Sequence, residues 1–119
     1  MEIKKLINKL IKVKKIDILI NNAGALFLEK KKILYSRTIM LNYFSYVYIT
    51  EKLKFNIERS LDKKIIFISS HVQSKASFDN NDFHVLKKYN FWELYKISKL
   101  FITTYAFILK KKNKILNIY

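Results

Sequence analysis

The chain has 119 residues, half of them hydrophobic, and is therefore long enough to form one domain with a hydrophobic core. Its formal net charge is +15, but its arginines are only Arg37 and Arg59, so the bidentate arginine contacts that read base edges are nearly absent and a nucleic-acid partner is not expected. The lack of cysteine excludes disulfides and thiolate metal sites, and His71 and His84 have no companions at metal-ligand spacing.

Residues 1–15 predict an amphipathic helix. Lysines alternate there with apolar residues at helical spacing, and these apolar residues are Ile3, Leu6, Ile7, Leu10 and Ile11. We expect this helix to cover a sheet, as helices do in α/β proteins. A basic amphipathic helix on a membrane surface has the same pattern and stays open as the alternative.

No stretch of the sequence predicts a membrane span. The uncharged runs at residues 38–50 and 100–109 are shorter than the roughly 20 residues that a spanning helix needs. The N-terminal residues also lack the uninterrupted hydrophobic region of a secretory signal.

Residues 16–20 predict a short parallel strand. The run reads IDILI, and its apolar, β-branched character is typical of a strand that is buried on both faces. The turn Asn21, Asn22, Ala23 and Gly24 follows. Gly24 is the only glycine of the chain, which indicates a turn where the backbone approaches another group closely. An ordinary strand-to-loop turn is the alternative.

Residues 35–55 predict a long, aromatic-rich helix that contains Asn42. Leu41, Tyr43 and Phe44 flank this polar side chain. If Asn42 is buried, its amide needs hydrogen-bonding partners. An Asn42 on a solvated helix face would need none, and both interpretations stay open.

Two further apolar runs, at residues 65–68 and 115–119, predict two more strands. The first ends in Ser69 and Ser70 and leads into a long polar loop, residues 71–90, that could shape a substrate mouth. The resulting order of elements is typical of parallel β-α-β winding. Ligands of such sheets bind beyond the carboxyl ends of the strands, where the Asn21–Gly24 turn and Ser70 lie.

Residues 91–109 predict the helix with the most reactive side chains. Tyr95 and Lys99 are four residues apart and therefore share one helix face. A cation beside a phenol favours its ionised form, so the pair could exchange a proton with a carbonyl or alcohol oxygen. By itself, this spacing also fits an ordinary surface pair.

Together these features resemble the short-chain dehydrogenase/reductase family. The matching pieces in chain order are the Asn21-Asn22-Ala23-Gly24 turn, Asn42, Ser70 and the motif Tyr95-Lys96-Ile97-Ser98-Lys99. Residues 41–50 and the separation of Ser70 from Tyr95 are most similar to the retinol-dehydrogenase-like and WW-domain-oxidoreductase-like branch.

The resemblance implies an α/β fold in which residues 1–119 form a single partial NAD(P)-binding domain, part of a Rossmann-like doubly wound parallel sheet with three strands and covering helices. It implies hydride transfer between NADP or NAD and a carbonyl or alcohol of a small molecule, such as a retinoid, a steroid or another lipophilic compound. An intracellular location, cytoplasmic or membrane-associated, and a homodimer are compatible with it.

The resemblance also implies roles for individual residues. Tyr95 would be the general acid or base, and Lys99 would favour its ionised form and hold the nicotinamide ribose. Ser70 would hold the substrate oxygen, and Asn42 would anchor a water that relays protons to Lys99. The turn Asn21, Asn22, Ala23 and Gly24 would pack beside the cofactor. No metal is implied.

One part of the family's pattern has no counterpart here. The glycine-rich turn that presents the cofactor pyrophosphate to a helix is absent, and so is the residue that selects NAD or NADP. We therefore expect a fragment, the C-terminal half of the dinucleotide-binding fold, which by itself binds dinucleotide poorly and aggregates through an unpaired strand edge. Two alternatives remain. One is a catalytically inactive remnant that serves as an interaction module, and the other is a basic protein that binds a nucleic acid or a membrane surface.

Overall fold

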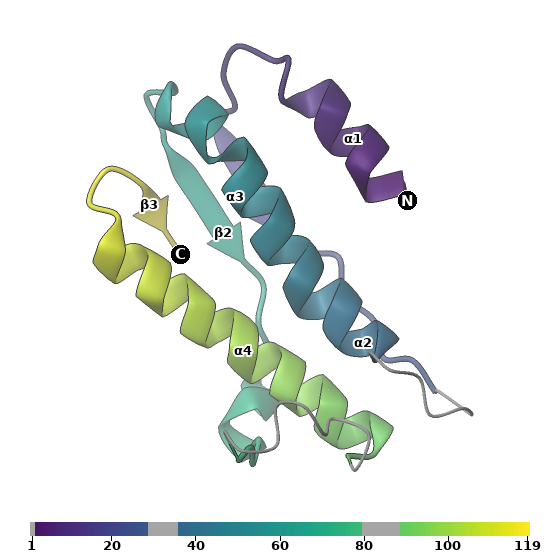
Figure 1. The fold of residues 1–119 in the computed structure, drawn as a ribbon. Helices are drawn as coiled ribbons and strands as arrows, with labels where there is room; N and C mark the ends of the chain where they lie inside the picture. Colours follow the sequence, from purple (N-terminus) through teal and green to yellow (C-terminus); the bar gives the residue numbers. More distant parts are fainter. Residues whose placement is uncertain (1, 29–35, 80–88) are drawn as a thin grey trace.

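The computed structural model describes residues 2–28, 36–79 and 89–119 (Figure 1). The elements in chain order are helix α1 (Glu2–Leu10), strand β1 (Ile18–Asn21), helix α2 (Arg37–Ile39), the π-helical turn η1 (Met40–Phe44), helix α3 (Ser45–Glu58), strand β2 (Lys64–Phe67), the 3-10 turn η2 (His71–Lys75), helix α4 (Phe91–Lys112) and strand β3 (Asn117–Ile118). No helix in these ranges is long and apolar enough to cross a membrane.

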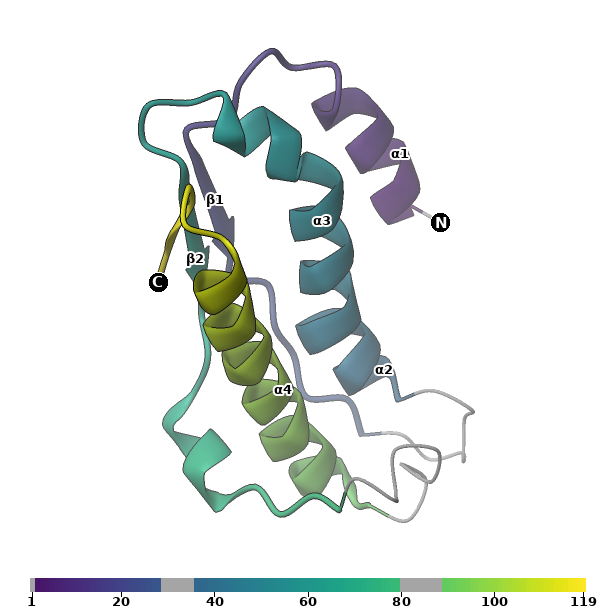
Figure 2. The ribbon, with the colours of Figure 1, turned by 60° about the vertical axis from the view of Figure 1, so that its left-hand side comes forward.

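The three strands form one parallel sheet in the order β1-β2-β3. Ile20 lies opposite Ile66 across the first pair, and Lys64 lies opposite Asn117 across the second. Helices α3 and α4 run side by side over one face of this sheet, and α1 packs on the outer side of α3 (Figures 1 and 2). The parallel α/β architecture predicted from the order of the elements is confirmed.

The main hydrophobic core lies between the sheet and α3 and α4. Its buried members are Ile7, Tyr46, Leu53, Ile57, Ile65, Phe67, Ile102, Leu109, Leu116 and Ile118. Helix α1 joins this core through Ile7, so residues 2–10 belong to the helical layer. The helix predicted within residues 1–15 is confirmed for Glu2–Leu10, but it packs chiefly on α3, at the outer side of the helical layer, and not on the sheet as predicted (Figure 1).

The expectation that the strands are buried on both faces is wrong for the residues that the structure describes. Successive strand residues point to opposite faces, and only one face carries helices. Ile65 and Phe67 are buried, whereas Ile18 and Ile20 on β1 are 45% and 57% exposed. Strand β1 is also an edge strand, as expected.

Element boundaries shift slightly from the sequence-based expectations. The predicted helix at 35–55 corresponds to α2, η1 and α3, which follow one another with helical backbone angles at Met40 and Ser45. The strand predicted at 115–119 shortens to Asn117–Ile118. In the predicted loop at 71–90, residues 71–75 form η2, and residues 80–88, with His84, lie outside the described residues.

Candidate active site

The predicted site residues come from four segments at the carboxyl end of the sheet. The turn after β1 supplies Gly24, η1 supplies Asn42, the segment between β2 and η2 supplies Ser70, and α4 supplies Tyr95 and Lys99. Three of them converge on one point, because a Cβ atom added at Gly24 would lie 3.4 Å from Lys99 Nζ and 3.5 Å from Asn42 Oδ1. The close approach predicted for Gly24 is therefore an approach to Asn42 and Lys99.

Asn42 is fully buried and satisfies its amide with three hydrogen bonds. Its Oδ1 accepts from the Ala25 backbone N–H at 2.9 Å, and its Nδ2 donates to the Ala25 carbonyl at 3.1 Å and to Ser98 Oγ at 3.0 Å. The π-helical turn η1, a geometry that recurs at functional sites, carries this residue. Asn42 therefore ties the turn after β1 to α4, and the alternative of a solvated asparagine is wrong.

Lys99 is a buried cation with few partners. It is 4% exposed, and its Nζ donates to the Ile68 carbonyl at the end of β2 over 3.0 Å. Burial lowers the pKa of this ammonium. Among the described residues Lys99 forms no ion pair, so an ammonium with three donor hydrogens can still donate to the hydroxyl groups of a ligand.

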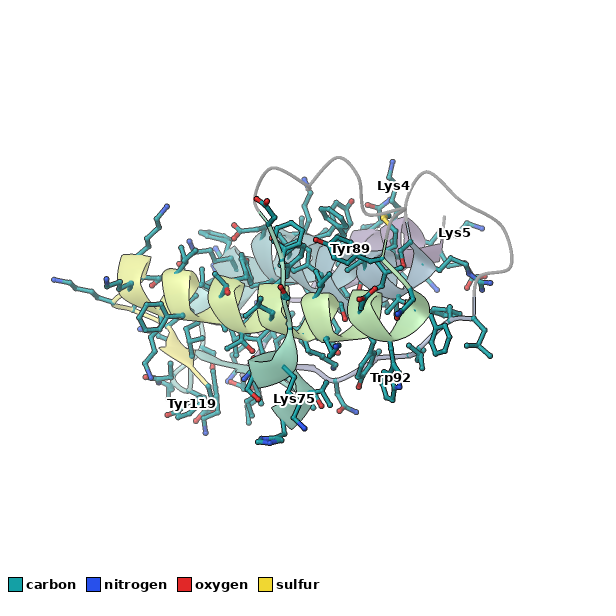
Figure 3. The ribbon with its side chains drawn as sticks, turned by 90° about the horizontal axis from the view of Figure 1, so that it is seen from below. Lys4, Lys5, Lys75, Tyr89, Trp92 and Tyr119 are labelled. Atoms are coloured by element: carbon teal, nitrogen blue, oxygen red, sulfur yellow. The ribbon has the colours of Figure 1, made fainter. Side chains whose placement is uncertain are left out.

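Tyr95 lies one helical turn before Lys99 on α4. Lys99 Nζ lies 5.7 Å from the centroid of its ring. Within the described ranges the Tyr95 hydroxyl forms no hydrogen bond, which leaves it free to contact a ligand oxygen. The ring centroid of the half-exposed Trp92, labelled in Figure 3, is 5.8 Å from that of Tyr95, so an aromatic surface lies beside the Tyr95 ring.

Ser70 occupies the N-cap of η2 at the end of β2. Its Oγ accepts only a long contact from the Val72 N–H, at 3.5 Å, and it makes no hydrogen bond to Tyr95 or Lys99 in the described structure. The η2 turn contacts α4, so Ser70 lies on the same side of the sheet end as the Tyr95 helix. The structure therefore brings Ser70 into the neighbourhood of the site without joining it to the other side chains.

Asn21, the last residue of β1, and the turn residues Asn22 and Ala23 lie beside this site. Buried Asn21 donates through Nδ2 to Thr50 Oγ1 at 3.1 Å, and the Tyr46 hydroxyl donates to the Ala23 carbonyl at 2.7 Å. Burial, together with nearby Tyr95, raises the pKa of Tyr46 to about 12. Asn22 is exposed, so the turn is held by its neighbours and presents Asn22 to solvent.

Two serines that the sequence analysis did not select also position the site. Ser98 is fully buried, and its hydroxyl donates to the Tyr95 carbonyl at 2.7 Å while accepting from Asn42. Ser69 Oγ lies 3.1 Å from the Lys99 carbonyl and 2.7 Å from Thr103 Oγ1. Ser98 belongs to the Tyr95–Lys99 motif that carried the family resemblance, whereas the sequence signal for Ser69 was only its place beside Ser70 at the end of a predicted strand.

A comparison with protein families agrees with this arrangement. Residues 1–106 match the family described as short chain dehydrogenase, and the match includes every site residue discussed above. A search of curated proteins found no match to the chain. Because the match covers most of the sequence and the sheet is parallel, the chain belongs to the short-chain dehydrogenase family of NAD(P)-binding oxidoreductases with a Rossmann-like fold.

Proposed function

We propose that this protein transfers a hydride between a nicotinamide cofactor and a carbonyl or alcohol, with Tyr95 and Lys99 handling the proton. The observation that carries the proposal is the buried Lys99 ammonium beside the Tyr95 ring, with donors of both side chains free for ligands. When bound, the nicotinamide supplies or accepts the hydride.

The chain's own residues then have the following roles in reduction. The Tyr95 hydroxyl donates a proton to the substrate oxygen, and in oxidation its phenolate takes that proton back. The Lys99 charge stabilises the phenolate and, through Nζ, can donate to ribose hydroxyls. Ser70, whose hydroxyl has only one long contact, donates a hydrogen bond to the substrate oxygen.

Asn42 and the turn after β1 complete this arrangement. The Asn42 side chain is occupied by Ala25 and Ser98, so it fixes the turn and α4. We assign to the same residue the anchoring of a water that relays protons to Lys99, through the second lone pair of Oδ1, because both Nδ2 hydrogens are already donated. Asn21, Asn22, Ala23 and Gly24 would pack beside NADP or NAD; of these, Asn21 is buried and the other three are exposed.

The residues present fit the nicotinamide-ribose end of a dinucleotide and leave the pyrophosphate end without a binding loop. Gly24 is the only glycine of the 119 residues, so a glycine-rich phosphate loop would have to be supplied by residues outside this sequence. We infer that the chain is the C-terminal half of the dinucleotide-binding domain of a longer polypeptide. The uncovered sheet face at Ile18 and Ile20 and the free edge of β1 support this inference.

The substrate we propose is lipophilic, such as a retinoid or a steroid, as in the retinol-dehydrogenase-like branch. Exposed Phe91 and Trp92 lie one turn before Tyr95 on α4 and support an apolar substrate. We also place the protein inside the cell and propose a homodimer.

The test uses the protein isolated from its own cells with an antibody against residues 91–109, so that any additional chain is retained. NADPH- and NADH-dependent reduction of retinal and of steroid ketones is measured for the wild type and for Tyr95→Phe. We expect turnover to fall by at least about a hundredfold in the variant, because proton transfer contributes that much. Tyr48→Phe on α3, whose hydroxyl has no hydrogen bond among the described residues, is the control.

Unchanged turnover of Tyr95→Phe would assign the proton transfer to another group. Peptide mapping of the same sample tests the longer polypeptide: upstream peptides with a glycine-rich sequence are expected. A species no larger than this chain, without reductase activity, would favour an inactive remnant over the enzyme.

A further inference from the structure

Helix α1 and the turn after it carry a charged surface that the proposed reaction does not use. Its lysines are all exposed and are Lys4, Lys5, Lys9, Lys12, Lys14 and Lys15. We call these lysines, together with Leu6, Ile11 and Val13, the α1 basic surface. The Lys4 and Lys5 side chains extend away from α1 into solvent (Figure 3).

Almost none of this charge is neutralised within the molecule. Lys15 pairs with Asp17 at 3.3 Å, and the side chains of the other five lysines form no ion pair or hydrogen bond with any described residue. Glu2 is the only other acidic residue before position 29. Like charges this close repel one another, so the surface favours a partner that carries several negative charges.

The apolar members of the surface select the kind of partner. Leu6, Ile11 and Val13 are 49%, 50% and 44% exposed, whereas Ile7 on the inner side of α1 is buried in the core. Ile7 attaches the helix to the fold. Leu6 borders the open hollow between α1 and β1 with Leu19 and Ile20, and Ile11 and Val13 are exposed after the helix. A nucleic acid offers phosphates but no apolar phase to these side chains, whereas an anionic bilayer offers both.

We propose that the α1 basic surface binds the surface of an anionic phospholipid bilayer. The lysines lie among the headgroups, and Leu6, Ile11 and Val13 enter the boundary between headgroups and acyl chains. Helix α3 separates α1 from α4 in both ribbon views, so this contact leaves Tyr95 and Lys99 uncovered (Figures 1 and 2). The proposal does not depend on catalysis.

The first experiment asks whether Leu6 enters the lipid. The chain contains no cysteine, so Leu6→Cys provides a single site for an environment-sensitive fluorophore. Vesicles of phosphatidylserine and phosphatidylcholine should raise and blue-shift its emission, and vesicles of phosphatidylcholine alone should not. Phe107→Cys is the matched control, because Phe107 is also exposed and lies beside lysines at the end of α4.

The second experiment separates charge from insertion. Lys4→Gln with Lys5→Gln should weaken vesicle binding about thirtyfold, since each lysine near a charged surface contributes about 1 kcal/mol, or about fivefold. Leu6→Ser with Ile11→Ser should weaken it at least about tenfold. Phe107→Ser with Ile108→Ser should bind like the wild type.

Two results would overturn the proposal. One is an unchanged spectrum of the label at Leu6 on phosphatidylserine vesicles that do bind the chain. The other is a loss of vesicle affinity in the Lys4→Gln, Lys5→Gln variant but not in the Leu6→Ser, Ile11→Ser variant, together with displacement of the chain from the vesicles by duplex DNA. That result would mean that the surface binds polyanions in general and not a bilayer. Salt-resistant insertion at Leu6, absent at Phe107, would confirm it.

Discussion

Replacing Asn42 by alanine tests whether this residue joins the turn after β1 to α4. The substitution leaves the helix backbone unchanged and removes the whole amide. The Ala25 N–H and carbonyl then lose their side-chain partner, and Ser98 Oγ loses a donor. Because Asn42 is fully buried, no bulk solvent replaces these contacts directly.

The expected loss of stability follows from these three hydrogen bonds. Each contributes a net 1 kcal/mol or so, and buried groups left without a partner cost about 1–3 kcal/mol more. Ala25 is half-buried, so its N–H and carbonyl can recover part of the lost hydrogen-bond free energy by binding water. We therefore expect Asn42→Ala to lower the free energy of unfolding by about 3 kcal/mol, a large fraction of the roughly 5–15 kcal/mol that a domain of this size has.

The assay is urea unfolding followed by far-UV circular dichroism, with Asn22→Ala as the control. Asn22 belongs to the same turn but is exposed and forms no side-chain hydrogen bond in the described structure, so its loss should change stability by less than about 0.5 kcal/mol. A double-mutant cycle of Asn42→Ala with Ser98→Ala should give a coupling energy near 1 kcal/mol. Equal losses in Asn42→Ala and Asn22→Ala, with no coupling to Ser98, would refute the role assigned to Asn42.

Two further predictions concern the same turn. Gly24→Ala should change the free energy of unfolding by less than about 1 kcal/mol, because Gly24 does not have a positive φ and the added Cβ would make ordinary contacts. The larger side chain of Gly24→Val must displace Lys99 and should cost about 1–3 kcal/mol, measured by thermal unfolding. Equal costs for the two variants would contradict the steric explanation. The pKa of Tyr46 is about 12 in the folded state and about 10 in the unfolded state. Between about pH 10 and about pH 12 the unfolded state therefore binds fewer protons than the folded state, and the free energy of unfolding falls by about 2 kcal/mol. Urea unfolding of Tyr46→Phe between about pH 9 and about pH 12 should show a shallower fall, and an unchanged slope would assign it to other groups.

Much of the architecture could be predicted from the sequence because the signals are local. Apolar β-branched runs, separated by a helix-length segment, are sufficient to indicate parallel strands, and ligands of such sheets bind at the strand ends. The need of Asn42 for partners was predictable from its apolar neighbours. The identity of those partners was not, because Ala25 and Ser98 are distant in the chain and become neighbours only when α4 packs against η1.

At the uncovered face of the sheet, the burial predicted from the residue pattern of β1 differs from the burial in the structure. A strand that faces solvent on one side ordinarily alternates apolar and polar residues, yet β1 places Ile18 and Ile20 on its open side and Leu19 on the side of the helices. The sequence of β1 is therefore suited to a sheet with helices on both faces, which is why burial on both faces was predicted. This composition supports the proposed longer polypeptide independently of the missing glycine-rich turn.

The polar groups of the site divide into those that hold the fold and those that stay free for a ligand. Asn42 and Ser69 form hydrogen bonds with neighbouring segments, and Ser98 donates within α4 to the Tyr95 carbonyl. The Tyr95 hydroxyl and two donor hydrogens of Lys99 have no partner in the described structure, although burial of the lysine charge lowers its pKa and costs stability. A merely structural site would pair these groups or replace Lys99 by an apolar residue, so their availability supports a ligand with hydroxyl and carbonyl oxygens.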